Sequence, residues 1–407
     1  MEEKKNKKRH MILVLLFLGW CLYYLDRMAM NVGIVVIAED FNLSPSVMGI
    51  VLSSFFAGYA IMQLPGGWLA DKFGSRKIIT ISILIWSLFT ILTGMAWSLM
   101  SMIIIRFMFG LGEGGYPAAS SKAIADVFPK NERTSAQTIM MSSNSLGGVI
   151  APLIATPLIV WVGWQNLFIG IGLFGVLFAA LFWYYLKPEN MQVEITEILG
   201  AEKIQKESFK DILKISASWK LAIMWFAVST VIWGLISWMP PYLVNVRGLD
   251  LMSMGMLTSI PALFGALGVI IGGQLIKSLL SGKEKYLSIV SLIIMIISLY
   301  LLFNASSVLL VIIYQSICMF FHGPVVATIF SLPHKLFSKN VLGSAFGVVN
   351  LGGMIGAFLA PMVMGYLIEV FNGYYASAFI YIIVCAVIGI FAAASLNSKK
   401  DLEVKPL

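Results

Sequence analysis

The sequence predicts an all-α membrane protein with twelve membrane-spanning helices. Of its 407 residues, 59% are hydrophobic and only 12% are charged, whereas soluble domains carry about twice that charged fraction. Apolar runs of about 20 residues, the length that an α-helix needs to cross a bilayer, recur between short polar loops. The expected spans are residues 11–37, 46–69, 78–98, 101–124, 134–161, 164–187, 219–243, 252–277, 285–304, 307–335, 341–369 and 373–396.

The basic residues follow an alternating pattern that sets the orientation of these spans. Lys and Arg gather in the N-terminal tail and in every second loop, whereas the opposite loops contain only Arg247. This positive-inside pattern predicts an even number of spans with both termini in the cytoplasm. The formal net charge of +8 is therefore no sign of nucleic-acid binding. Because the first apolar run is long and holds a charged pair, we expect it to stay as a span and not to be removed as a signal peptide.

The three cysteines and the repeat structure support the same view. Cys21, Cys318 and Cys385 all fall inside predicted spans, so they read as packing residues and not as a disulfide framework. Short segments recur at an offset of about 205–209 residues, which predicts two parallel six-helix halves with the substrate near the midplane between them. The recurring pairs are residues 63–69 and 271–275, 128–136 and 337–345, and 145–148 and 350–353.

These repeats divide the chain into two domains and a linker. Residues 1–187 form the predicted N-terminal half and residues 219–407 the C-terminal half. The polar stretch at 188–218, rich in Lys and Glu, is the predicted cytoplasmic linker, with a short surface helix near 195–199. It reads equally well as a simple tether.

The loop after the second span carries the first family motif. Its sequence runs Gly-Trp-Leu-Ala-Asp-Lys-Phe-Gly-Ser-Arg-Lys over residues 67–77 and resembles the signature loop of the major facilitator superfamily. A loop that only sets topology explains the Lys and Arg, but not the Asp and the glycines. The resemblance implies the major facilitator fold and a cytoplasmic gate between the halves. The second copy, at residues 273–277, lacks the Asp, so the gate is expected on one side only. The predicted gate residues are Gly67, Asp71, Lys72, Gly74 and Arg76.

Four ionisable residues lie at bilayer depth, where each costs roughly 2.5–3.5 kcal/mol and usually marks a transport path. Asp26 and Arg27 are adjacent in the first span, so their side chains point about 100° apart. Arg106 and Glu113 in the fourth span are seven residues apart, hence on one helix face and about 10.5 Å apart along the axis. A carboxyl group in a low dielectric favours its neutral form, which suits a proton carrier.

Motifs around these residues are similar to the anion:cation symporter family, over nearly the whole chain. They are Tyr24-Leu25-Asp26-Arg27, residues 106–114, residues 128–133 and Trp238-Met239-Pro240-Pro241-Tyr242. The family includes bacterial galactonate, glucarate and hexuronate transporters. The resemblance implies that Asp26 and Glu113 carry protons and that Arg27 binds the substrate carboxylate. Arg106 is a further candidate substrate ligand, and its reading as a structural partner for an acid is equally open. The alternative for Asp26 and Glu113 is a fixed buried ion pair.

Further polar residues extend the predicted substrate site. Tyr59 and Asn144 occupy positions that contact the substrate in sugar-acid members of the family, and Asn350 matches a family Asn. Asn144 stands where a galactonate transporter has Gln, so the sugar acid is left open. Trp233 is a weaker candidate that helix packing would also explain. The seventh span has no second Arg of the kind found in vesicular glutamate transporters, which disfavours multiply anionic cargo.

The sequence contains no Walker-type nucleotide loop, metal-ligand cluster or nucleophile motif. We therefore expect no enzyme, cofactor or metal site. The expected function is proton-coupled symport of a small organic anion, a sugar acid such as an aldonate, aldarate or hexuronate, by alternating access. We expect a monomer in the bilayer of a bacterial inner membrane. The alternatives are an exporter of drugs or metabolites, which the central Arg27 disfavours, and a non-transporting nutrient receptor, which the short C-terminal tail disfavours.

Overall fold

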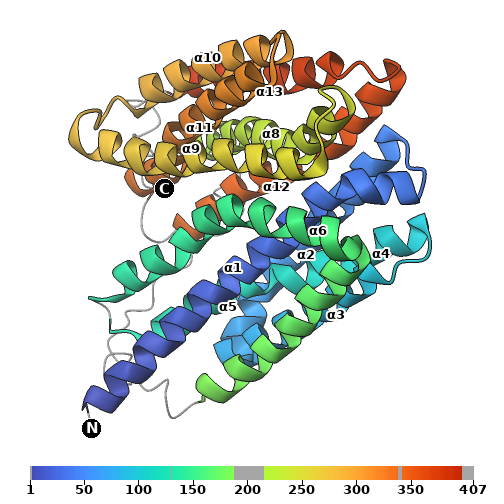
Figure 1. Cartoon of the computed structure of the whole chain (residues 1–407). Helices are drawn as coiled ribbons and strands as arrows, with labels where there is room; N and C mark the ends of the chain where they lie inside the picture. The colour runs from blue at the N-terminus through green and yellow to red at the C-terminus, as the bar shows by residue number, and fades with distance from the viewer. Residues whose placement is uncertain (1, 130, 188–214, 338–341, 397–407) are drawn as a thin grey trace. The chain divides into compact units, whose positions relative to one another are not determined.

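The computed structural model describes residues 2–129, 131–187, 215–337 and 342–396. Over these ranges all regular secondary structure is α-helical (Figure 1). The predicted linker helix near 195–199, most of the 188–218 linker and the repeat residues 338–341 lie outside the described residues.

Six helices make up the first half. They are α1 (Glu2–Asp40), α2 (Pro45–Phe73), α3 (Ser75–Gly94), α4 (Leu99–Gly114), α5 (Tyr116–Val127) and α6 (Arg133–Tyr185). The expected fourth span is divided at Gly115 into α4 and α5. The expected fifth and sixth spans are joined in α6, which breaks at Gly163. Gly163 has φ 83° and ψ 155°, a backbone conformation that side chains with a Cβ rarely adopt.

Six more helices follow in the second half. They are α8 (Ser216–Asn245), α9 (Leu251–Ser278), α10 (Glu284–Phe303), α11 (Val308–Leu336), α12 (Leu342–Val370) and α13 (Ala376–Ser395). α12 packs along α8, and α10 packs against both α11 and α13. The α8–α12 contact depends on glycine: a Cβ on Gly352 would lie 2.0 Å from the carbonyl oxygen of Ala222.

The helices correspond to the twelve expected spans. Within the described ranges, ten helices are long and apolar enough to span a bilayer. That number counts α6 once, although its break at Gly163 divides it into the expected fifth and sixth spans, and it leaves out α4 and α5, the two pieces of the expected fourth span. The predicted all-α architecture of twelve spans is confirmed.

Two compact units contain the described helices. One holds α1, α3 to α6 and most of α2; the other holds α8, α10 to α13 and most of α9. In the first unit α1 runs beside α6 (Figure 1), and α3 packs against α4, α5 and α6. The site described next lies wholly in this first unit.

Candidate functional site

The first buried ion pair of the site joins α1 to α4. Arg27 Nε donates a hydrogen bond to Glu113 Oε2 over 2.8 Å. The two side chains are only 7% and 0% exposed. Charges so deeply buried are stable only when they are paired, and removing one partner typically destabilises a protein by about 3–5 kcal/mol.

A second pair lies alongside the first. Arg106 Nη1 is 3.9 Å from Asp26 Oδ1, and the Thr90 hydroxyl of α3 donates a hydrogen bond to Asp26 Oδ2. The adjacent residues Asp26 and Arg27 therefore face different residues of α4, as the 100° step between them predicts. For Arg106, the geometry matches the alternative in which it is the partner of an acid.

Aromatic rings surround the Arg27 guanidinium. Its central carbon lies 4.2, 4.4 and 4.6 Å from the ring centroids of Tyr23, Phe55 and Tyr59. Arg27 Nη2 also donates a hydrogen bond to the Tyr23 hydroxyl. These cation–π contacts hold the charge in a poorly solvated place. Neither hydrogen bond of Arg27 uses Nη1, so part of the planar fork remains for another acceptor.

Glycines allow the helices to approach closely enough for these contacts. A Cβ on Gly110 of α4 would lie 2.1 Å from the Phe55 carbonyl oxygen of α2, and one on Gly58 of α2 would lie 2.0 Å from the Phe107 carbonyl oxygen. On the other side of α4, a Cβ on Gly112 would lie 2.8 Å from the backbone nitrogen of Trp86 of α3. The glycine run around Glu113 thus allows close helix contact.

Several buried polar atoms of the site remain unsatisfied. Among the described residues, Asp26 Oδ1, Glu113 Oε1 and the Nε and Nη1 atoms of Arg106 are buried without a hydrogen-bond partner. Buried polar groups in proteins are nearly always hydrogen-bonded, so each exception needs an explanation. Each of the two carboxyl groups thus has one oxygen without a hydrogen-bond partner, which can receive a proton.

Two of the other predicted substrate residues, Tyr59 and Arg106, lie in this cluster with Arg27. Asn144 lies on α6, with its Nδ2 3.6 Å from Met141 Sδ and its Oδ1 buried without a partner among the described residues. Trp233 and Asn350 are half-buried on α8 and α12 of the second unit. Their roles stay predictions.

Sequence reasoning missed Phe55 of α2 and three further residues of the cluster. Tyr23 and Asn31 lie four residues before and after Arg27, on the same face of α1, and the Asn31 amide donates to the Arg27 carbonyl oxygen over 3.0 Å. That spacing was a usable signal. Thr90 comes from α3 and has no such signal in the sequence.

The predicted gate loop is built around Gly74. Its φ of 86° lets the chain turn from α2 into α3, in a conformation that favours glycine. Gly67 on α2 has only the Ala118 side chain near its Cβ position, at 3.8 Å. Asp71 is 79% exposed and lies 3.4 Å from Lys122 Nζ of α5. The Lys72 ammonium lies 4.7 Å from the Trp68 ring centroid.

Arg76 of this loop caps the end of α6. Its Nε and Nη2 donate to the Trp183 carbonyl oxygen over 3.0 and 2.5 Å, and its guanidinium lies 3.9 Å from the Trp183 ring centroid. The last carbonyls of a helix lack partners within the helix, so a cation is favourable there. Arg76 is thus bound within its own unit.

The second unit repeats this arrangement with different residues. In the first unit, Ser75 Oγ donates a hydrogen bond to Asp126 Oδ2 over 2.7 Å. At a repeat offset of 209 residues, the matching positions in the second unit are Glu284 and Lys335, which form an ion pair. Adding 209 to 76 gives Lys285, which donates to the Leu396 carbonyl oxygen over 2.8 Å at the end of α13. The second loop thus lacks the Asp but has an ion pair of its own within its unit, and the one-sided gate stays a prediction.

The described residues contain no group of three or more His, Cys, Asp or Glu side chains that could hold a metal ion. Cys21, Cys318 and Cys385 are free thiols.

Comparisons with known proteins agree with this architecture. Residues 16–361 and 280–406 match a family model described as Major Facilitator Superfamily. The probable sulfoacetate transporter of Cupriavidus necator is 31% identical over 97% of this chain and 94% of its own length. The probable galactarate/D-glucarate transporter of Escherichia coli K12 is 29% identical over 93% and 92%. The hexuronate transporter of Bacillus subtilis is 33% identical over 66% and 64%.

One solved structure shows the same fold. The crystal structure of a bacterial homologue of the human lysosomal transporter Spinster aligns with a TM-score of 0.82 over 95% of this chain and 96% of that chain, at 21% identity.

Proposed function

The chain belongs to the Major Facilitator Superfamily, and from this membership we propose that it imports a small organic anion together with protons. It is a multi-pass membrane transporter and not an enzyme. The observation that carries the proposal is Arg27, a permanent cation buried at membrane depth and bound to a single carboxylate. A buried guanidinium with a free donor edge is well suited to a substrate carboxylate.

The relatives support the substrate class. Those that resemble the chain over most of its length are named as transporters of sulfoacetate, galactarate, glucarate and galactonate. All of these are small anions with at least one carboxylate. We propose a sugar acid, an aldonate, aldarate or hexuronate, as the cargo. Sulfoacetate is the second candidate because its transporter is similar over 97% of this chain.

Charge balance at the site supports proton coupling. Asp26, Arg27, Arg106 and Glu113 sum to zero when all are ionised, and all four are buried. An entering carboxylate would add an uncompensated negative charge in a low dielectric, which is costly. A proton on Glu113 restores neutrality and also releases Arg27 Nε to the substrate. In this scheme Glu113 and the substrate compete for one guanidinium.

Asp26 provides a second proton site. One proton with one monoanion is electroneutral, so only the pH gradient drives it, with about 1.4 kcal/mol per pH unit. A second proton adds roughly 3.7 kcal/mol at 100 mV and one pH unit. In this proposal Arg106 holds the Asp26 side chain in place, and its positive charge stabilises the ionised carboxylate after the proton has been released.

The remaining assignments complete the proposal. Tyr59, Asn144, Trp233 and Asn350 line the substrate path, and the loop from Gly67 to Arg76 forms the cytoplasmic gate. The two halves at 1–187 and 219–407, joined by a cytoplasmic linker at 188–218, alternate access to the site. The protein acts as a monomer in a bacterial inner membrane, with both termini in the cytoplasm.

Uptake into proteoliposomes tests the proposal. Labelled galactonate, glucuronate, glucarate and sulfoacetate are offered with the lumen more alkaline than the medium. We expect accumulation of at least one of them that disappears when a protonophore removes the gradient. Liposomes with Arg27→Ala protein serve as the control. Uptake that does not depend on the pH gradient would contradict proton coupling. If none of these anions is taken up, the proposed cargo class is contradicted.

A further inference from the structure

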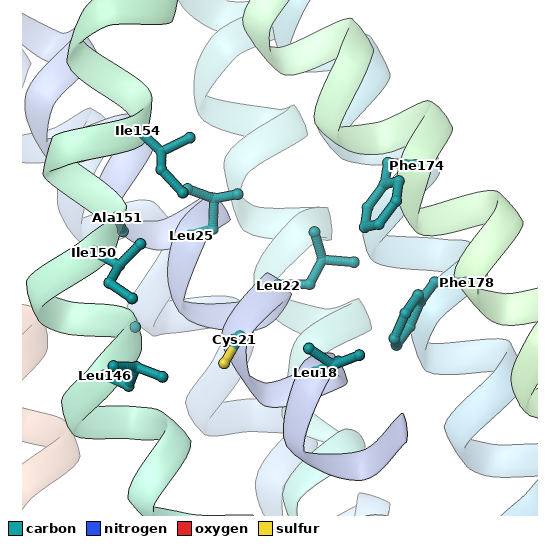
Figure 2. Close-up of a pocket in the computed structure, with 11 residues that line it drawn as sticks. Leu18, Cys21, Leu22, Leu25, Leu146, Ile150, Ala151, Ile154, Phe174 and Phe178 are labelled. Carbon is teal, nitrogen blue, oxygen red and sulfur yellow. The ribbon is translucent and has the colours of Figure 1, made fainter. Parts of the chain in front are cut away.

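An apolar groove opens on the first unit between α1 and the two parts of α6 that flank Gly163 (Figure 2). Its cavity has a volume of about 190 Å³. The groove lies in membrane-spanning segments, and the exposed fractions of Ile150, Ile154 and Phe174 are 37%, 42% and 55%. Side chains that are apolar and exposed at this depth face lipid. The residues used below are Leu18, Cys21, Leu25, Ile150, Phe174 and Phe178.

Close packing on both sides of α1 shapes the groove. A Cβ on Gly147 would lie 2.6 Å from the Tyr24 Cβ, so the first part of α6 touches α1 there. On the opposite wall, a Cβ on Gly175 in the second part of α6 would lie 3.7 Å from Leu22 Cδ2 of α1. The two parts of α6 form the walls and α1 forms the floor, as Figure 2 shows. A groove of this shape accepts a chain and not a flat surface.

Charge distinguishes the two ends of the groove. Arg9 precedes Leu18 by nine residues of α1, which is about 13.5 Å along the helix axis. Lys187 follows Phe178 by nine residues and lies just beyond the end of α6 at Tyr185. Residues 2–9 contain five basic and two acidic residues. At the other end of α1 the charged residues are Glu39 and Asp40, both acidic.

We propose that the groove binds one acyl chain of an anionic phospholipid whose phosphate lies near Arg9 and Lys187. Basic residues at the cytoplasmic ends of membrane helices bind anionic headgroups, and half of a bilayer with its headgroup region is about 20–22 Å thick. Leu18 and Leu25 lie about 13.5 and about 24 Å from Arg9 along α1, so a phosphate at the level of Arg9 sends its acyl chain into the groove near the membrane centre. The bound chain supports α1 on the side of Leu25, next to Asp26 and Arg27.

Photo-crosslinking of the full chain in nanodiscs tests this site. The probe is phosphatidylglycerol with a diazirine in one acyl chain, in a phosphatidylcholine bilayer. We expect crosslinks on the peptides that contain Cys21 and Ile150, and stronger competition by unlabelled phosphatidylglycerol than by phosphatidylcholine. Each base near an anionic surface raises affinity about fivefold, so Arg9→Gln with Lys187→Gln should weaken the competition about 30-fold.

Matched tryptophan variants distinguish lipid bound in the groove from ordinary boundary lipid. Ile150→Trp fills the groove and should remove the crosslinks, whereas Leu153→Trp, a lipid-facing change on the same helix at a residue that does not line the cavity, should keep them. Equal crosslinking in both variants would overturn the groove. Equal competition by the two lipids would overturn the choice of an anionic headgroup.

A measurement on the unaltered chain keeps the test independent of these variants. Cys21 lines the groove, whereas Cys318 and Cys385 are 0% and 3% exposed, so an apolar maleimide should alkylate Cys21 first. Phosphatidylglycerol in the nanodisc should slow this alkylation relative to phosphatidylcholine alone. Identical rates in the two bilayers would contradict the proposal.

Discussion

Arg27 and Glu113 form a buried hydrogen-bonded ion pair that ties α1 to α4, with 2.8 Å between Nε and Oε2. The pair lies beside a second one, between Asp26 and Arg106, so four charges share one buried cluster. In the proposed mechanism, substrate binding at Arg27 and proton binding at Glu113 are linked, because each changes what the guanidinium can bind. The predictions below separate this link from the structural role of the same residues.

Arg27→Ala should abolish substrate binding, and Arg27→Lys should weaken it severely because an ammonium lacks the planar fork. Binding is measured by calorimetry with the anion that the wild type transports. Arg247→Ala is the control: Arg247 donates to the Tyr242 hydroxyl and the Ala305 carbonyl oxygen and should leave affinity unchanged.

Loss of binding must be separated from loss of fold. Removing Arg27 alone leaves Glu113 as an unpaired buried charge, so the thermal midpoint should fall. Adding Glu113→Gln to Arg27→Ala should recover much of that stability without recovering binding. A double variant that binds the anion normally would show that the carboxylate sits elsewhere.

Gly110→Ala should destabilise the first unit, because the new Cβ would lie 2.1 Å from the Phe55 carbonyl oxygen. Overpacking of this kind typically costs about 1–3 kcal/mol, and the shift of α2 would also move Tyr59. Gly170→Ala is the matched control on α6, where no atom lies within 4 Å of the Cβ position. A thermal melt in detergent compares them; equal midpoints would refute the close α2–α4 contact.

The Glu284–Lys335 ion pair of the second unit should contribute more to stability than the Asp71–Lys122 contact of the signature loop. Glu284 is 5% exposed and also accepts from the Gly282 N–H over 3.0 Å, whereas Asp71 is 79% exposed. Lys335→Ala should therefore lower stability by about 1 kcal/mol, a modest value because Lys335 itself is 43% exposed. Lys122→Ala should have almost no effect. A thermal midpoint that falls more in Lys122→Ala would reverse this ranking.

Apolar runs predicted the spans, and ionisable residues at bilayer depth, together with the family resemblance, predicted the main members of the site. The residue spacing placed Asp26 and Arg27 toward different partners. The break at Gly163 falls between the predicted fifth and sixth spans, but the break at Gly115 was missed, because a continuous apolar run does not show whether a helix is interrupted within it. Thr90 could not be found, since its contact with Asp26 depends on how α3 packs against α1.

The second loop shows a different limit of sequence reasoning. The second copy of the loop, after α9, lacks the Asp, so the sequence predicted a gate on one side only and gave no sign of another contact. An ion pair joins Glu284 at the start of α10 to Lys335 near the end of α11. The repeat preserves the place of the contact but not the type of residue, so only the structure reveals it.

Cysteine labelling should place both termini and the linker on one side of the membrane. In a background without the native cysteines, single cysteines within residues 1–10, 188–218 and 397–407 should react only with reagents that reach the cytoplasm. A cysteine in place of Arg247 should react from the outside. Labelling of the linker from outside would contradict the orientation that the basic residues predict.

Transport by Glu113→Gln tests proton coupling most directly. Gln keeps the size of Glu but cannot bind or release a proton, so the pH gradient can no longer reset the site. In one set of proteoliposomes, this variant should lose uphill uptake driven by an imposed pH gradient and still exchange labelled for unlabelled substrate. Asp26→Asn, beside Arg27 and opposite Arg106, is expected to lose both activities. Full gradient-driven accumulation by Glu113→Gln would contradict the coupling and leave Arg27 and Glu113 as a structural ion pair.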